Sequence, residues 1–129
     1  GASARAVGSP CAGGGRRPRL FASDPILGGV LRIEASRLVA QRNGFLVLLP
    51  PLRQPVPLAG SVCFAHGDWA RAVVLSRFVT TTGTSTVNVP VPNLPVLDRY
   101  QAILRAVVAP TGGPLLGDLT NAVRLSFGD

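Results

Sequence analysis

The chain has 129 residues, the size of one ordinary domain, with 47 % apolar and 15 % charged residues. That balance excludes intrinsic disorder, and no apolar run approaches the about 20 residues that a membrane-spanning helix needs. All 13 basic residues are arginines, and the net charge of +7 is compatible with an anionic polymer or cell surface, although a G+C-rich coding bias explains scattered arginines better.

The first 17 residues are small, polar and glycine-rich, and we expect them to form an extended arm that precedes a single domain over residues 18–129. In this arm Ala2, Ala4 and Ala6 alternate with other residues, which is a weak strand signal. Such a segment, completed by Val7, is suited to pairing with an unpaired sheet edge of a neighbouring subunit, where N–H and C=O groups are open.

From Pro18 onward apolar residues alternate with polar ones, and glycine, proline and asparagine mark turns between short segments. The predicted strands lie, in chain order, around residues 20–22, 31–35, 45–49, 62–64, 72–80, 87–91, 100–108 and 123–127. Seven or eight short strands spaced by about 8–12 residues are typical of an all-β sandwich or barrel. We therefore predict an antiparallel β-sandwich, immunoglobulin-like or jelly-roll-like, without long helices.

Prolines predict where the chain leaves a sheet, because proline cannot donate to the strand ladder. Pro50 and Pro51 are expected to end the strand before them, and residues 55–57 are expected to interrupt the chain again. Pro90 lies inside a predicted strand and places that strand at a sheet edge. His66 is expected in a loop after a short strand.

The segment from residue 100 to residue 108 has the cleanest alternation in the chain. We expect Tyr100, Leu104 and Val108 to face the core, opposed by Leu125 and Phe127 of the last strand. Because successive side chains point to opposite faces of a strand, a register error of one residue would invert this assignment.

The two cysteines, Cys11 and Cys63, fit one disulfide formed in an oxidising compartment, which would make the protein secreted or exposed at the cell surface. Two unrelated buried thiols are the alternative. Two cysteines and one histidine cannot complete a closed four-ligand zinc site, so no metal is expected.

His66 and Asp68 are the only candidate acid–base pair in the sequence. A catalytic triad is defined by geometry rather than by the presence of its residue types, and the acidic residues are isolated from one another. Gly13, Gly14 and Gly15 lack the lysine and the following helix of a phosphate-binding loop. We expect no catalytic residues, no cofactor and no enzymatic activity.

Arg16, Arg17 and Arg19 form a cluster of arginines, and Trp69 is the single tryptophan. These residues are the candidate ligand contacts, since arginines attract anionic polymers and an exposed tryptophan stacks on sugar rings. The alternative for Trp69, which we favour, is burial at the end of the sandwich. Nucleic acid is not expected as a partner, because aromatic residues do not interleave with the arginines.

Residues 80–86 are rich in hydroxyl groups and are predicted to form a turn between two β-branched strands. A functional interpretation of the same segment is O-glycosylation of an exposed hairpin. The candidate acceptors are Thr81, Thr82, Thr84 and Ser85.

Several stretches carry a family resemblance: GSPCAGGG, LFASDPILGGVLRIEAS, FLVLLPP, TVNVPVPNLPVL, YQAILRAVVAPTGG and LTNAVRLSFG. From Ser9 to Gly128 the chain resembles an uncharacterised bacterial secreted module found at the C-terminal ends of large exported proteins in planctomycetes and other G+C-rich bacteria. The resemblance implies an extracellular β-sandwich with a Cys11–Cys63 bridge and no known enzymatic role. Residues 66–69 depart from the pattern of that family.

Two functional classes stay open at this point. The favoured expectation is a non-enzymatic extracellular structural protein, a self-associating subunit of a surface layer or filament that forms a homo-oligomer or homopolymer. The alternative is an extracellular adhesion module that binds polysaccharide or another anionic polymer through its arginines. Salt separates the two, because binding through arginines weakens steeply with ionic strength, whereas strand pairing does not.

Overall fold

The computed structural model describes residues 1–12, 16–58, 63–109 and 117–129. Within these ranges the regular structure consists of eleven β-strands and short 3-10 helices, and the ladders between strands are antiparallel. The predicted all-β class with antiparallel sheets is therefore confirmed, with more strands than the seven or eight expected. No helix in the described ranges is long and apolar enough to cross a membrane.

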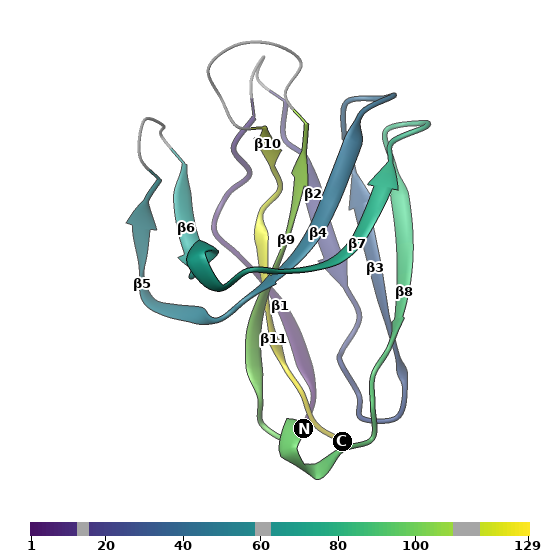
Figure 1. Ribbon diagram of the computed structural model, residues 1–129, viewed down its shortest axis with the longest axis vertical. Helices are drawn as coiled ribbons and strands as arrows, with labels where there is room; N and C mark the ends of the chain where they lie inside the picture. The colour runs from purple at the N-terminus through teal and green to yellow at the C-terminus, as the bar shows by residue number, and fades with distance from the viewer. Residues whose placement is uncertain (13–15, 59–62, 110–116) are drawn as a thin grey trace.

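The larger sheet has the strand order β1-β11-β9-β4-β7, and β10 pairs with β9 beside this path (Figure 1). Its strands are β1 (Ser3–Val7), β4 (Asn43–Leu49), β7 (Val73–Val79), β9 (Gln101–Val108), β10 (Asp118–Leu119) and β11 (Ala122–Ser126). The first strand of the chain therefore pairs with the last, and β1 and β7 are the two edge strands of this sheet.

A second sheet, ordered β2-β3-β8, consists of β2 (Arg19–Ala22), β3 (Val30–Ser36) and β8 (Ser85–Pro90). Pro90 lies in the edge strand β8, as predicted. A separate hairpin pairs β5 (Pro51–Pro57) with β6 (Phe64–Gly67), and the 3-10 helices are η2 (Trp69–Arg71) and η3 (Pro95–Leu97) (Figure 1).

The main core lies between the two larger sheets and draws residues from both, which gives a sandwich-like arrangement. In β3 the buried residues Leu31, Ile33 and Ala35 alternate with exposed or half-buried ones, as a strand with one buried face requires. From the larger sheet, Leu104 and Leu125 enter the same core and are fully buried.

The predicted core face of β9 and β11 is correct for four of its five residues. Leu104, Val108, Leu125 and Phe127 all belong to the main core. The prediction is wrong for Tyr100, which precedes β9 and is 44 % exposed. Its N–H donates to the Leu97 carbonyl in the turn after η3, so the strand begins only at Gln101 and its first core residue is Ala102. The Tyr100 ring contacts that of Phe127 at 5.7 Å between centroids.

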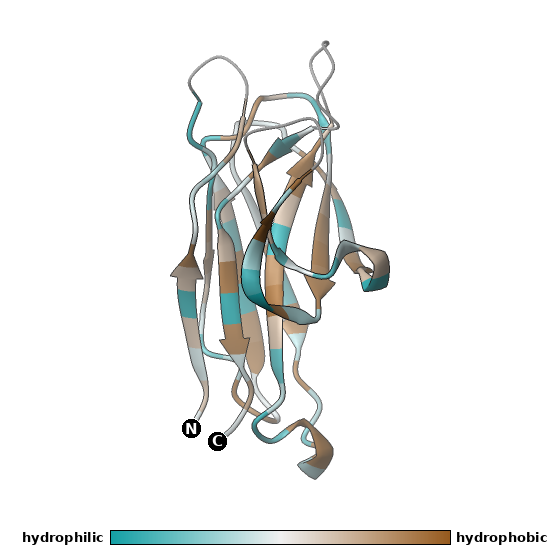
Figure 2. Cartoon of the chain, turned by 90° about the vertical axis from the view of Figure 1, so that its left-hand side faces the viewer, coloured by the Kyte–Doolittle hydropathy of each residue, from teal (hydrophilic) through white to brown (hydrophobic). Residues whose placement is uncertain are grey.

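The outer face of the larger sheet is also covered, so β9 is buried on both sides. Val47, Leu49, Ile103 and Ala122 form a second apolar cluster there, which we name the outer cluster. β6 approaches it closely, because a Cβ added at Gly67 would lie 2.6 Å from the Leu49 Cβ. Figure 2, in which the side of the β5–β6 hairpin faces the viewer, shows apolar residues (brown) concentrated along the strands.

Two predictions about the hairpin are wrong. Residues 55–57 belong to β5 and do not interrupt the chain, because a strand in a two-stranded hairpin has an open edge where a missing N–H is tolerated. His66 lies in β6 and not in a loop, since this strand runs from Phe64 to Gly67. Residue 62 of the predicted strand lies outside the described residues. The chain does leave the larger sheet after Leu49, as predicted.

The N-terminal segment differs from the extended arm that the sequence predicts. β1 pairs with β11 of the same chain, from Ser3 opposite Ser126 to Val7 opposite Ala122. The pairing satisfies backbone groups that β11 would otherwise leave open at a sheet edge, which is the physical reason for the difference.

The hydroxyl-rich segment forms the predicted turn between β7 and β8, with Gly83 at a φ of +82°. It is not the hairpin that the glycosylation hypothesis assumed, because β7 and β8 belong to different sheets and the segment crosses from one sheet to the other. Thr81, Thr82 and Thr84 are exposed, and Ser85 begins β8. Their placement on a turn is compatible with O-glycosylation, which stays a prediction.

Candidate functional site

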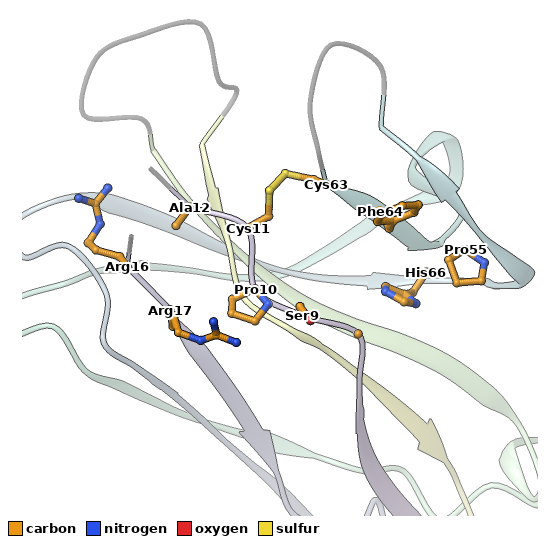
Figure 3. Close-up of a pocket in the computed structure, with 11 residues that line it drawn as sticks. Ser9, Pro10, Cys11, Ala12, Arg16, Arg17, Pro55, Cys63, Phe64 and His66 are labelled. Carbon is orange, nitrogen blue, oxygen red and sulfur yellow. A yellow bond between two sulfur atoms is a disulfide. The ribbon is translucent and has the colours of Figure 1, made fainter. Parts of the chain in front are cut away.

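Residues 8–12, which we name the connector, join β1 to the side of the β5–β6 hairpin. Cys11 and Cys63 form the predicted disulfide, with their Cα atoms 5.6 Å apart (Figure 3). The N–H of Cys11 donates to the Leu119 carbonyl at 2.8 Å, and the N–H of Leu119 donates back at 2.7 Å. The connector is therefore anchored at Cys11 by a covalent bond and by a pair of backbone bonds.

A buried arginine, Arg105, holds the connector through a hydrogen bond to its backbone. Arg105 is 1 % exposed. Its Nε donates to the Thr120 carbonyl at 2.8 Å. Its Nη1 and Nη2 donate to the carbonyls of Phe64 at 2.6 Å and Ser9 at 3.5 Å. The guanidinium thus joins β6, the connector and the turn before β11.

Burial lowers the pKa of Arg105 to about 10, so the group is still charged at neutral pH. Its charge is solvated by backbone carbonyls in place of water, which is how a buried cation is tolerated. Sequence reasoning missed this residue. The available signal was one charged residue within the apolar stretch of β9.

Asn121 fixes β2 against the larger sheet. Its Oδ1 accepts from the Leu20 N–H at 2.9 Å, and its Nδ2 donates to the Leu20 carbonyl at 3.1 Å. This side chain therefore replaces a strand partner for Leu20 and sets the position of the arginines that precede it.

His66 packs against the connector from the hairpin side. A Cβ added at Gly8 would lie 2.1 Å from the His66 Nε2, and Gly8 has a φ of +70°, so glycine is required there on both counts. Burial, and then repulsion by Arg105 and Arg124, lowers the pKa of His66 below its usual value. The imidazole is therefore neutral at physiological pH.

Asp68, the predicted acid–base partner of His66, is engaged in its own turn. Its Oδ1 accepts from the Ala70 N–H at 3.0 Å and caps η2, and its Oδ2 lies 3.7 Å from the Arg71 Nε. Among the described residues, no group of three or more His, Cys, Asp or Glu side chains is placed to hold a metal ion.

Two pockets flank the connector. The larger, of about 600 Å³, lies on the hairpin side, where His66 and Cys63 contribute to its lining (Figure 3). The smaller, of about 260 Å³, lies beside β2. Its lining comprises Ala6, Gly8, Ser9, Pro10, Arg17, Arg19, Leu20, Arg37 and Asn121.

The small pocket gathers three arginines. Arg17, Arg19 and Arg37 are all exposed, and among the described residues no carboxylate lies within 4.0 Å of them. Arg16 differs, because its Nη2 donates to the Asp118 Oδ2 at 2.8 Å. The predicted cluster is therefore divided: Arg16 belongs to an ion pair, and Arg17 and Arg19 line the pocket.

Arg37 was missed by sequence reasoning because it is distant from the other arginines along the chain. The β2–β3 ladder places Arg19 opposite Ser36, the residue before Arg37. The predicted strands at residues 20–22 and 31–35 contained the necessary signal, but only their pairing brings Arg37 to Arg19.

Trp69 lines neither of these pockets. It lies in η2 and packs, partly buried, against the outer cluster. Its Nε1 is buried and has no hydrogen-bond partner among the described residues. Trp69 is therefore partly buried on the outer face of the larger sheet, apart from Arg17 and Arg19 in the small pocket.

No protein-family model matches the chain, and no curated protein matches it.

Proposed function

We propose that the protein is a non-enzymatic, secreted structural subunit that self-associates by exchanging β1. In this proposal β1 of one copy leaves its own β11 and pairs with β11 of the next copy. Each copy then has one donor strand and one acceptor edge, and such a head-to-tail contact builds an open filament or layer. The observation that carries the proposal is the position of β1, an edge strand whose strand partner in the sheet is β11.

Few side-chain contacts hold β1 in place. Ala4 packs against the main core and Val7 against the outer cluster, whereas Ala6 is exposed. Ala2 is attached through its N–H, which donates to the Asp129 carbonyl at 3.3 Å. Backbone pairing with β11 therefore provides most of the attachment, at about 0.5–1.5 kcal/mol net per hydrogen bond. Because β11 of another copy offers the same bonds, exchange is nearly neutral in energy.

The connector allows β1 to move while the rest of the domain stays closed. Gly8 has a φ of +70° and, as a glycine, changes its backbone conformation at little cost. Cys11 is tied to Cys63 and to the backbone of Leu119. Residues 8–10 are therefore the natural hinge, because Cys11, which follows them, is anchored independently of β1.

Asp24 favours exchange over the addition of a foreign strand beside β1. Its Oδ1 accepts from the Ala4 N–H at 3.0 Å. This bond occupies a backbone donor on β1 and blunts that edge against further pairing. The acceptor that an incoming β1 needs is β11, which becomes open when its own β1 leaves.

Contacts between neighbouring domains must add to the exchange, because an energetically neutral swap does not offset the loss of translational freedom. β7, at the opposite edge of the same sheet, exposes apolar surface. Val73 is 57 % exposed, Val74 is 54 % exposed and Val79 is 57 % exposed. Exposed apolar edge strands are sites of association.

The Cys11–Cys63 disulfide supports secretion, because disulfides form and persist in oxidising compartments. We also propose that the strands of the sandwich follow an immunoglobulin-like or jelly-roll-like topology.

A pair of engineered cysteines tests the exchange directly. Ser3 and Ser126 lie opposite each other in the β1–β11 ladder. In the double variant Ser3→Cys and Ser126→Cys, the new bridge forms within one chain if β1 stays in place and between chains if it is exchanged. Exchange predicts a ladder of covalent multimers on a non-reducing gel, which collapses on reduction.

The matched control is Ser3→Cys alone, which can form no covalent species beyond a dimer through that position. A double variant that runs as a monomer, with the new bridge found within one chain by mass spectrometry, contradicts the proposal. Deletion of residues 1–8 is an independent test by sedimentation. If the shortened chain assembles as the full chain does, β1 is not the element that connects copies.

A further inference from the structure

We infer that Arg17, Arg19 and Arg37 form a binding site for the carboxylate or sulfate groups of an extracellular acidic polysaccharide. The inference concerns the small pocket beside β2 and does not depend on strand exchange. It rests on how the β2–β3 ladder brings the arginines together, on the unbalanced charge that results, and on the chemistry of the pocket lining.

The sheet positions the three arginines at one end of β2 and β3. Arg19 is the first residue of β2, Arg17 precedes it, and Arg37 follows the last residue of β3. Because these strands are antiparallel, with Arg19 opposite Ser36, the start of one meets the end of the other. Arg37 adopts a φ of +57°, and the N–H of the next residue, Leu38, donates to the Gly83 carbonyl at 2.9 Å.

The floor of the pocket is rigid. Asn121 lines it, and the amide of this side chain is bonded through both of its polar atoms to the backbone of Leu20. Residues of the connector also line the pocket, and the connector is anchored beyond them at Cys11. The side of the pocket formed by Asn121 and Leu20 is therefore held in place, which reduces the entropy that is lost when a ligand binds there.

The charge of the pocket is not balanced by the protein. Among the arginines that the structure describes, three have acidic partners: Arg16 with Asp118 at 2.8 Å, Arg32 with Glu34 at 2.6 Å and Arg71 with Asp68 at 3.7 Å. In the described part of the chain, the three arginines of the small pocket have no carboxylate within 4.0 Å. The three guanidinium groups around the cavity repel one another, and a bound oxyanion offsets this repulsion because each guanidinium is attracted to it.

The lining favours an oxyanion carried by a sugar polymer. A guanidinium presents a planar fork of donors that matches carboxylate or sulfate oxygens. Among the described residues that line the small pocket none is aromatic, whereas sites for single-stranded nucleic acid stack bases on aromatic side chains. Its volume of about 260 Å³ lies below the about 300–1,000 Å³ of sites that enclose a whole small molecule. A charged substituent with part of its sugar ring fits this size.

The bound polymer has a path beyond the small pocket. Arg17 lines both pockets, and the connector lies between them. In Figure 3, Arg17 lies beside Pro10 of the connector, on the side away from His66. A polysaccharide seated at the small pocket can therefore continue across the connector into the larger pocket of about 600 Å³.

Binding to defined oligosaccharides tests the inference. The probes are a heparin oligosaccharide for sulfate groups and a polygalacturonate oligosaccharide for carboxylate groups, with neutral dextran as the control ligand. Calorimetry on the full chain is performed at several NaCl concentrations. The test variant combines Arg17→Gln, Arg19→Gln and Arg37→Gln, which removes the charges and keeps side chains of similar length.

A matched control variant combines Arg42→Gln, Arg53→Gln and Arg99→Gln. These arginines are exposed and do not line the small pocket, so this variant loses the same net charge elsewhere. We expect the pocket variant to lose at least about tenfold in affinity for an acidic oligosaccharide, and the control variant less than about threefold. The slope of log K against log salt should become shallower by about 2–3 in the pocket variant.

Four results would overturn the inference. They are equal losses in both variants, no binding of either acidic oligosaccharide at low salt, tighter binding of an oligothymidylate than of the sugars, and equal affinity for inorganic sulfate. Sedimentation of the pocket variant separates this inference from strand exchange, because assembly through β1 should persist when the arginines are replaced.

Discussion

Replacing Arg105 by methionine removes three hydrogen-bond donors from beneath the connector and keeps an unbranched apolar side chain. The largest loss is at Thr120, which is 0 % exposed, so its carbonyl is left buried without the Arg105 donor. An unsatisfied buried acceptor costs about 1–3 kcal/mol. Phe64 and Ser9 are exposed residues whose carbonyls regain water, and each loses about 0.5–1.5 kcal/mol.

Removing the charge also has a favourable part, because a buried cation carries a desolvation penalty that an apolar side chain does not. The free energy of unfolding of Arg105→Met should therefore fall by about 2 kcal/mol, and Arg105→Ala should fall further because it leaves a cavity. Urea unfolding measures this change, with the fluorescence of Trp69 as the probe, since that ring packs against the same face of the sheet.

Arg53→Met, at an exposed position of β5, is the matched control and should change stability by less than about 0.5 kcal/mol. An Arg105→Met variant as stable as the wild type would refute the reasoning. That result would mean that the desolvation penalty of the guanidinium equals the worth of its bonds to the three carbonyls.

Three further predictions concern the core, the disulfide and pH. Leu104 is 0 % exposed, so Leu104→Ala should lower the free energy of unfolding by about 2–5 kcal/mol in urea melts, and a loss below about 0.5 kcal/mol would contradict its place in the core. The Cys11→Ser and Cys63→Ser double variant removes a disulfide between residues 52 positions apart, and its free energy of unfolding should be lower by about 4 kcal/mol. Equal melting temperatures with and without the disulfide would disprove this. The pKa of His66 is lowered in the folded state by burial and by Arg105 and Arg124, so the unfolded chain binds the proton at higher pH. Stability should therefore fall as pH drops from about 7 toward about 5, and His66→Gln should flatten the urea-melt profile in that window, whereas an unchanged profile would assign the dependence to other groups.

Local patterns predict those parts of the fold that depend on neighbours along the chain. The alternation at Leu31 and Ile33 predicts β3, and the restrictions of proline predict both the exit after Leu49 and the edge position of Pro90. Gly83 predicts the hydroxyl-rich turn in the same way, because glycine adopts a positive φ at little cost. Side-chain alternation and backbone limits are properties of a few consecutive residues, so they can be deduced before the fold is known.

The candidate site is only partly legible in the sequence. Arg17 and Arg19 stand out as neighbours, and the disulfide partners Cys11 and Cys63 are the only cysteines. Arg37 joins them through the register of two strands, and Arg16 leaves the group because Asp118 lies beside it. Strand register and ion pairing link residues that are distant along the chain, and no local pattern encodes them.

Tertiary structure alone decides what covers each face of a strand. Because side chains alternate along β9, Arg105 lies on the face of the sheet opposite Leu104. If only the Leu104 face were covered, the face that carries Arg105 would be open to water. The β5–β6 hairpin and the connector cover that face, so the arginine is buried and its guanidinium bonds to their carbonyls. The sequence by itself determined an antiparallel all-β chain with its turns. The pairing of β1 with β11 and the burial of Arg105 depended on contacts between distant segments. A sheet edge or sheet face can be covered by any segment that the fold brings to it, and the sequence near that edge or face does not specify which segment this is.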